Sequence, residues 1–174
     1  MRVRAHLGRA MMFRAFSLFL ATAVLAAGFY FAVGSKADAA SEIYLSGKSE
    51  FGADFAAGGY DVVAYHKDGA PKVGRQEFAT EWKNATWRFS SAENLADFKQ
   101  SPEKYAPQYG GYCAYGLAKG YPAHGDPKHW AIVDGKLYLN YNGDVQTTWN
   151  KDHQSYITAA DKAALKVWPK AAAK

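Results

Sequence analysis

Polar and apolar residues alternate in two stretches of the chain, and this pattern predicts two β-hairpins. Between residues 85 and 89 polar side chains alternate with alanine and aromatic ones, which is typical of a half-buried strand. A similar run at 77–82 precedes it, with Lys83-Asn84 as the predicted turn. The second hairpin is predicted at 130–140, because alternating apolar positions flank Asp134-Gly135 and Asp-Gly is the strongest short turn signal.

Helical patterns and capping residues separate and follow these hairpins. Ser90 or Ser91 is a suitable cap for a helix over 91–100, and Pro102 stands at the favoured first position of another helical turn. The cysteine segment 109–117 predicts a loop that enters a short helix. A strand is predicted at 59–66, which is rich in β-branched and aromatic residues, and loops are predicted at 67–74 and 121–128. Two further helices are predicted at 144–149 and 155–167, and Trp168-Pro169 ends the second of them.

The order of these elements predicts the fold class. Strands are followed by helices, then by a hairpin and then by helices, without the strict strand–helix alternation of a parallel sheet. We therefore predict an α+β fold, with a small antiparallel sheet or hairpins and short helices packed on it. The predicted organisation is a spacer at 40–58, a single domain at 59–169 and a tail at 170–174.

Residues 1–39 have the pattern of an export signal. Four arginines precede an uncharged apolar run, Phe16–Val33, and Ala37-Asp38-Ala39 supplies the small-x-small pattern of a cleavage site. A run of about 18 residues also reaches the lower limit for a transmembrane helix. Two interpretations stay open: a cleaved signal peptide of a periplasmic protein, or an N-terminal anchor in the inner membrane with the domain facing the periplasm.

Charge excludes one class of partner. Residues 1–39 hold five basic residues and one acidic residue, a net charge of +4 out of +5 for the chain, so residues 40–174 carry only +1. Nucleic-acid binding is therefore not expected. A periplasmic protein partner and a tether to the inner membrane remain possible interpretations of an exported domain.

Residues 85–105, ATWRFSSAENLADFKQSPEKY, combine a strand that ends in aromatic-x-Phe, a serine-containing turn, a helix and Pro-Glu-Lys-Tyr. This combination resembles the YHS domain family. The resemblance extends over about 59–169, where it is similar to an exported subgroup through these stretches: GYDVVAY at 59–65, GGYCAYG at 110–116, DPKHW at 126–130, IVDGKLYLNYN at 132–142 and Trp168-Pro169. It implies a YHS-type domain with C-terminal helices.

The resemblance also implies a type of chemistry. YHS domains accompany copper ATPases and metal-dependent hydroxylases and are thought to bind metal through cysteines. Here the places of those cysteines hold Ala64, Ser90 and Asn94, so the scaffold carries over and the thiolate site does not. The exported subgroup includes selenoproteins, and we expect the selenium at the position of Cys113.

Cys113 is the single cysteine of the chain, and an unpaired thiol in an oxidising compartment is expected to be buried, ligated or used. With His124 and His129 it makes a candidate copper or zinc site. Near a helix start it is also a candidate catalytic nucleophile of a thiol oxidoreductase or peroxidase. The candidate ligand-binding residues around such a site are Asp61, Tyr112, Tyr115 and Trp130.

Three functions follow, and the sequence favours the first. The leading hypothesis is an exported binding or accessory module that handles copper or zinc through Cys113. The second is an enzyme with Cys113 as nucleophile. The third is a structural, partner-binding domain in which Cys113 only fills space, as buried free cysteines often do.

Overall fold

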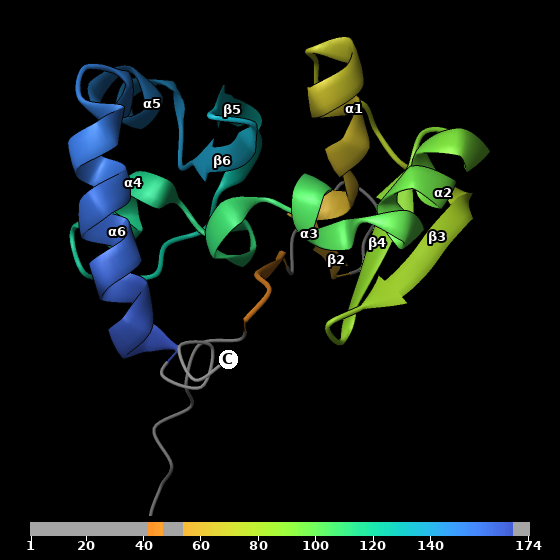
Figure 1. Cartoon of the computed structure of the whole chain (residues 1–174), viewed down its shortest axis with the longest axis horizontal. Helices are drawn as coiled ribbons and strands as arrows, with labels where there is room; N and C mark the ends of the chain where they lie inside the picture. Colours follow the sequence, from red (N-terminus) through yellow and green to blue (C-terminus); the bar gives the residue numbers. More distant parts are fainter. Residues whose placement is uncertain (1–41, 47–53, 169–174) are drawn as a thin grey trace, which may run out of the picture. The chain divides into compact units, whose positions relative to one another are not determined.

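The computed structural model describes residues 42–46 and 54–168, which belong to one compact unit (Figure 1). Within these residues the strands form three antiparallel pairs. The strands are β1 (Leu45–Ser46), β2 (Phe55–Ala56), β3 (Arg75–Trp82), β4 (Ala85–Phe89), β5 (Asp126–Val133) and β6 (Lys136–Asn140). The helices are α1 (Val62–Asp68), α2 (Ala92–Gln100), α3 (Pro102–Tyr105), α4 (Ala114–Ala118), α5 (Gly143–Asn150) and α6 (His153–Val167), with 3₁₀ turns η1 (Ala57–Gly59) and η2 (Gln108–Gly111). The predicted α+β class is confirmed.

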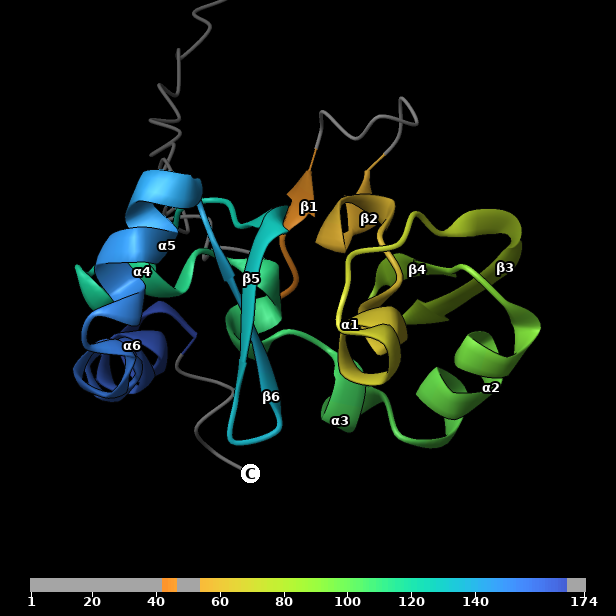
Figure 2. The ribbon, with the colours of Figure 1, turned by 90° about the horizontal axis from the view of Figure 1, so that it is seen from above.

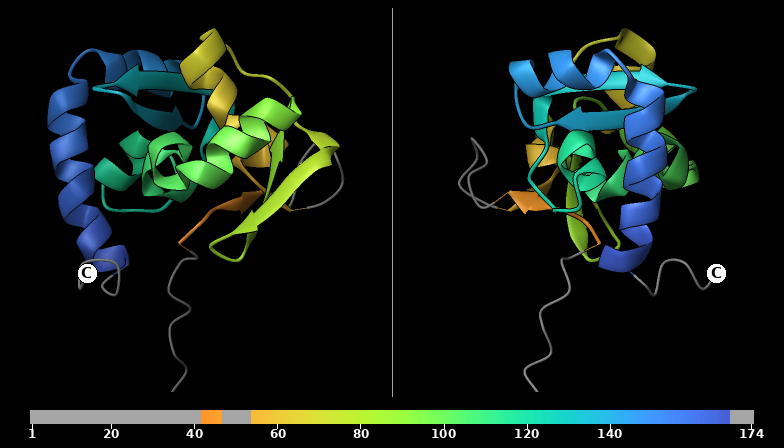
Figure 3. Two further views of the ribbon diagram at one scale, coloured as in Figure 1. Left: turned by 45° about the vertical axis from the view of Figure 1, so that its right-hand side comes forward. Right: turned by 90° about the vertical axis from the view of Figure 1, so that its left-hand side faces the viewer.

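Both predicted hairpins form. β3 pairs with β4 across Lys83-Asn84, and β5 pairs with β6 across Asp134-Gly135. All four turn residues have positive φ, the geometry that suits two-residue hairpin turns. α2 packs against β3 and β4 (Figure 3) and is capped by the side chain of Ser91, as predicted.

The strand predicted at 59–66 is wrong, because this segment forms α1. The carboxylate of Asp61 accepts hydrogen bonds from the backbone amides of Val63 and Ala64, which starts a helix, and Gly69 ends it in the left-handed conformation. Residues 62–65 are all buried, so the segment is apolar on every side. An apolar run without a period does not distinguish a strand from a buried helix.

The packed core begins before the predicted boundary at Gly59. Ile43, Ala56 and Ala57 lie in the predicted spacer at 40–58, yet they are buried in the main hydrophobic cluster. That cluster also holds Trp87, Phe89 and Phe98, whose rings lie against one another. The described part of the spacer is therefore part of the folded unit.

Strand β6 joins two hydrophobic clusters. Leu137 and Leu139 belong to the main cluster, whereas Tyr138 belongs to a second cluster with residues of α4, α5 and α6. Successive side chains of a strand point to opposite faces, so β6 is buried on both sides. Figure 2 shows the β5–β6 hairpin between α3 and the C-terminal helices. Asn140 ends this strand, on the same face as Tyr138.

The predicted export signal lies outside the described residues. Among the residues that are described, no helix combines the length and the apolar character needed to cross a membrane.

Candidate functional site

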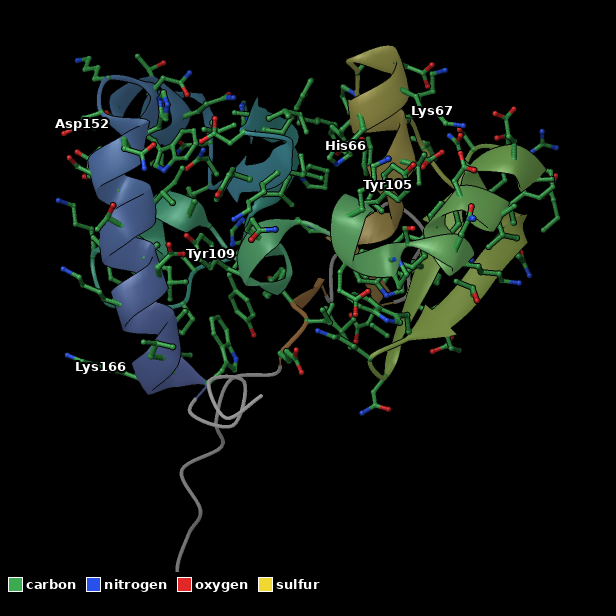
Figure 4. All side chains as sticks on the ribbon, viewed as in Figure 1. His66, Lys67, Tyr105, Tyr109, Asp152 and Lys166 are labelled. Atoms are coloured by element: carbon green, nitrogen blue, oxygen red, sulfur yellow. The ribbon has the colours of Figure 1, made fainter. Side chains whose placement is uncertain are left out.

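The backbone before Cys113 is unusual, since three consecutive residues have positive φ. These are Tyr109, Gly110 and Gly111, with φ of 58°, 64° and 92°. At Gly110 a Cβ atom would lie 1.8 Å from the carbonyl oxygen of Glu42, so a side chain is excluded there by a close approach of backbone. The Tyr109 hydroxyl donates a 2.8 Å hydrogen bond to Asp161 of α6. Figure 4 labels Tyr109 beside this helix. Burial raises the pKa of Tyr109, and the hydrogen bond to Asp161 raises it further.

Cys113 is the N-cap of α4 and is 1% exposed. Its backbone amide donates to the carbonyl of Ala123 at 2.8 Å, and its sulfur accepts a hydrogen bond from the backbone amide of Gly116 at 3.3 Å. The thiol thus takes the place that a serine or aspartate oxygen usually takes at a helix start. The predicted loop that enters a short helix is confirmed.

Asn140 lies beside the thiol. The Cys113 sulfur is 4.0 Å from Asn140 Oδ1, to which the thiol can donate. Asn140 is 0% exposed, and its Nδ2 has no hydrogen-bond partner within residues 42–46 and 54–168. A thiol and a carboxamide therefore share a buried space, with one amide donor unused.

A pocket of about 180 Å³ reaches the thiol, and Asn140 lies behind the sulfur rather than in the pocket lining. Its lining residues come from α4, the loop after it and the start of α5: Cys113, Tyr115, Gly116, Tyr121, Ala123, Tyr141 and Val145. Tyr121 and Tyr141 are 52% and 44% exposed, and they are two of the four large hydrophobic side chains exposed in the described part of the chain. The pocket thus runs from two exposed aromatic rings to a buried sulfur.

Neither of the two predicted histidine ligands, His124 and His129, lines the Cys113 pocket. His124 is exposed and its ring packs on Tyr141, with ring centroids 4.4 Å apart, while His129 packs against Gly143 at the start of α5. Within the described residues no three or more His, Cys, Asp or Glu side chains are grouped so that they would hold a metal ion. The copper or zinc site at Cys113, His124 and His129 stays a prediction.

Of the predicted ligand-binding residues, only Tyr115 shares the pocket with Cys113. Tyr112 is buried between Tyr44 and Trp168, and burial raises its pKa. Trp130 packs edge-on against Tyr65 at the main hydrophobic cluster.

Asp61 is the centre of a separate polar cluster. Its Oδ1 accepts from the backbone amides of Val63 and Ala64, and its Oδ2 accepts from the side chain of Asn94 at 2.7 Å and from both the amide and the hydroxyl of Ser90. Ala64, Ser90 and Asn94 are the three positions at which the resemblance to YHS domains predicts the cysteines of that family. In this chain they surround the fully buried carboxylate of Asp61. None of these residues lines the Cys113 pocket or the larger pocket that is bordered by α3 and η2.

A larger pocket, of about 350 Å³, lies elsewhere. It is bordered by the β3–β4 turn, α3, η2 and the end of α6, and its lining includes Trp82, Lys83 and Trp168. Its one amino group, that of Lys83, is paired with Glu42 at 2.7 Å. None of the predicted site residues lines it, so size alone does not make it the better site.

No protein-family model matches the sequence, and comparisons with curated proteins and with solved structures found no similar chain. The resemblance to YHS domains therefore stays a prediction, and the site is argued from its geometry.

The sequence missed three residues that complete the site: Tyr121, Asn140 and Tyr141. Tyr121 lies in a predicted irregular segment, and Tyr141 follows a predicted strand, so neither position carries a local signal. Asn140 carries a weak signal, because it is a polar residue directly after the apolar run Leu137–Leu139, in a strand whose last four residues are all buried.

Proposed function

We propose that this protein is an exported, YHS-type binding module whose site is the Cys113 pocket, where a small ligand contacts the thiol directly. The observation that supports it most is the combination of a sulfur that is 1% exposed with a pocket that reaches it between two exposed tyrosines. A thiol that only filled space would be expected to border packed side chains on every side.

The pocket also limits the kind of ligand. Its walls are mainly aromatic and small residues, and its volume of about 180 Å³ suits a molecule of a few non-hydrogen atoms. No lysine, arginine, aspartate or glutamate lines it, which favours an uncharged ligand. The soft sulfur of Cys113 is the distinctive group that such a ligand would meet.

A second candidate function is thiol redox chemistry with Cys113 as nucleophile. One observation favours it: the backbone amide of Gly116 already donates to the sulfur, which holds the sulfur in a fixed position at the pocket. This candidate uses the same pocket and differs from the first in turning over its ligand.

The test is the size dependence of thiol modification in the folded protein. We expect iodoacetamide to alkylate Cys113 in the wild type, and a maleimide carrying a long polymer to react only after unfolding in urea. Tyr121→Ala and Tyr141→Ala should each speed the reaction of the bulky reagent, because they open the outer wall of the pocket. Val73→Ala, at another exposed apolar side chain, is the matched control and should change neither rate.

Two outcomes would redirect the proposal. A thiol that reacts with neither reagent until the protein unfolds would make Cys113 a packing residue and favour the partner-binding, structural interpretation. Copper or zinc that copurifies with the wild type from its own compartment, and is lost in Cys113→Ser, would favour metal handling through Cys113 and would direct attention to His124 and His129.

A further inference from the structure

We propose that a small hydroperoxide entering the pocket oxidises Cys113 to a sulfenic acid, and that the side-chain amide of Asn140 holds the added oxygen. The proposal rests on the proposed function, because it uses the same pocket and the same thiol. It adds a substrate class and assigns Asn140 as a positioning residue.

The unused amide of Asn140 is the first argument. Its Nδ2 is buried and has no partner in the described part of the chain, although a buried donor without a partner destabilises a folded protein. Such a group calls for an explanation, and one explanation is a ligand or chemical state that supplies the acceptor. The Cys113 sulfur lies 4.0 Å from Oδ1 of the same side chain, and it is a reactive group that can gain an oxygen.

A sulfenic acid matches what Asn140 offers. The reduced thiol has one proton and can occupy only Oδ1, which leaves Nδ2 unused. A sulfenic acid has both an O–H donor and an oxygen acceptor, and a carboxamide presents an acceptor and donors side by side. Oxidation of Cys113 therefore gives Nδ2 the acceptor that it lacks, while the Gly116 amide continues to donate to the sulfur.

The chemical step is balanced by the peroxide alone. The Cys113 thiol loses its proton, and its sulfur attacks one peroxide oxygen with an electron pair, which forms the S–O bond and breaks the O–O bond. The departing oxygen takes up a proton and leaves as water or an alcohol. The hydroperoxide is the oxidant, and the sulfur is oxidised to sulfenic acid.

The site also protects the product. A sulfenic acid usually condenses with a nearby thiol, and this chain has no second cysteine. Cys113 is 1% exposed, so the thiol of another protein is kept away from it, and the aromatic walls admit only small molecules. Reduction is therefore left to a low-molecular-weight thiol that fits the pocket.

The experiment measures sulfenic acid formation on the intact protein. Wild type, Asn140→Leu and the control Asn142→Ala are treated with hydrogen peroxide, trapped with dimedone and weighed by mass spectrometry. Asn142 caps α5 through Val145, so its substitution changes a neighbouring carboxamide without touching the thiol. Iodoacetamide alkylation of the same samples reports general thiol reactivity.

We expect one dimedone adduct in the wild type and in Asn142→Ala, and none in Cys113→Ser. Asn140→Leu should form it about tenfold more slowly, equal to about 1.4 kcal/mol, with alkylation changed by less than about threefold. Equal rates in Asn140→Leu and the wild type, or direct passage of the wild type to sulfinic acid, would overturn the proposal.

A measurement on the wild type alone covers the case in which Asn140→Leu does not fold. The sulfenic acid should remain trappable by dimedone for longer in the folded protein than in urea, and a folded protein that loses it as fast would overturn the proposal. If iodoacetamide reaches Cys113 but no sulfenic acid forms, this inference fails and the proposed function stands. If neither reagent reaches the thiol, both fail.

Discussion

The hydroxyl of Ser90 donates a 2.6 Å hydrogen bond to the carboxylate of Asp61, and this pair ties the end of β4 to the start of α1. Asn94 of α2 donates to the same carboxylate oxygen. Among the described residues, Asp61 accepts hydrogen bonds from neutral donors, and its side chain is 0% exposed. A single buried carboxylate thus holds three elements together.

Asp61→Asn is expected to destabilise the protein strongly. An amide in place of the carboxylate turns one acceptor into a donor that faces the donors of Ser90 and Asn94. We expect the free energy of unfolding to fall by about 3 kcal/mol or more, because a buried network loses its acceptor. Urea denaturation followed by circular dichroism measures this change.

The matched control is Asp126→Asn. Asp126 also accepts a backbone hydrogen bond, from Lys128 at 2.8 Å, but this bond is exposed and lies at the start of β5. Its substitution should cost less than about 1 kcal/mol. Similar losses of free energy of unfolding in the two variants would show that the buried Asp61 cluster stabilises the fold no more than an exposed hydrogen bond does.

Local signals were enough to predict most elements. Asp134-Gly135, Ser91 and Pro102 each act on their own neighbours, and the structure has the expected turn, cap and helix start at these positions. The segment at 59–66 could not be predicted in this way, because its cap depends on Asp61 and its apolar residues are buried by the whole fold. Burial on all sides removes the periodicity from which a helix is usually recognised.

The candidate site was predictable only in part. Cys113 stands out as the single cysteine of the chain. Its neighbours are set by tertiary contacts: the Cys113 amide binds the carbonyl of Ala123, which fixes the loop containing Tyr121, and β6 brings Asn140 to the sulfur. Such long-range pairing leaves no pattern in the sequence near Cys113.

A second prediction concerns the glycine that precedes the cysteine. Gly110 and Gly69 have the same φ of +64°, yet a Cβ atom at Gly110 would lie 1.8 Å from the Glu42 carbonyl, whereas at Gly69 it would meet no described atom within 4 Å. Gly69→Ala should cost about 1 kcal/mol for its left-handed backbone. Gly110→Ala should lower the free energy of unfolding by at least about 2 kcal/mol more, because the backbone at Gly110 and the backbone at Glu42 must move apart.

Hydrogen exchange at Tyr44 is the sharper measurement for this pair. The Tyr44 amide donates to the Gly110 carbonyl at 2.9 Å, so displacement of residues 42–46 should remove its protection. Protection that is unchanged in Gly110→Ala would contradict the close approach. Gly69→Ala should leave it intact.

The third prediction is a pH dependence of stability that comes from His66. This half-buried ring lies edge-on to Tyr105, with the ring centroids 5.4 Å apart. Both residues are labelled in Figure 4. Burial, assisted by the charge of Lys104, lowers the pKa of His66 below its ordinary value of 6.5, although a hydrogen bond with the Tyr105 backbone opposes the shift. The unfolded chain therefore takes up this proton at a higher pH than the folded protein does.

It follows that His66 makes its full contribution to the free energy of unfolding above about pH 6.5. This contribution is lost as the pH falls through the lower pKa of the folded state. We expect the urea midpoint to drop more between about pH 7.5 and about pH 5 in the wild type than in His66→Phe, which keeps an aromatic ring. His124→Phe, at an exposed histidine, is the control and should follow the wild type. Parallel curves for wild type and His66→Phe would argue against this assignment.

The last prediction separates the two structural roles of Cys113, cap and core residue. Its sulfur accepts from the Gly116 amide, and a serine hydroxyl can replace it in that role, whereas alanine and valine cannot. We expect Cys113→Ser to lower the free energy of unfolding by about 1 kcal/mol and Cys113→Ala by about 2 kcal/mol, because alanine leaves the Gly116 amide unpaired in a buried place. Valine should be at least as damaging as alanine, since it adds bulk beside Asn140 without an acceptor. Urea denaturation under reducing conditions gives the order. Alanine and valine variants as stable as the wild type would mean that the thiol stabilises the fold neither as a cap nor by packing, and that its place in the pocket is its main role.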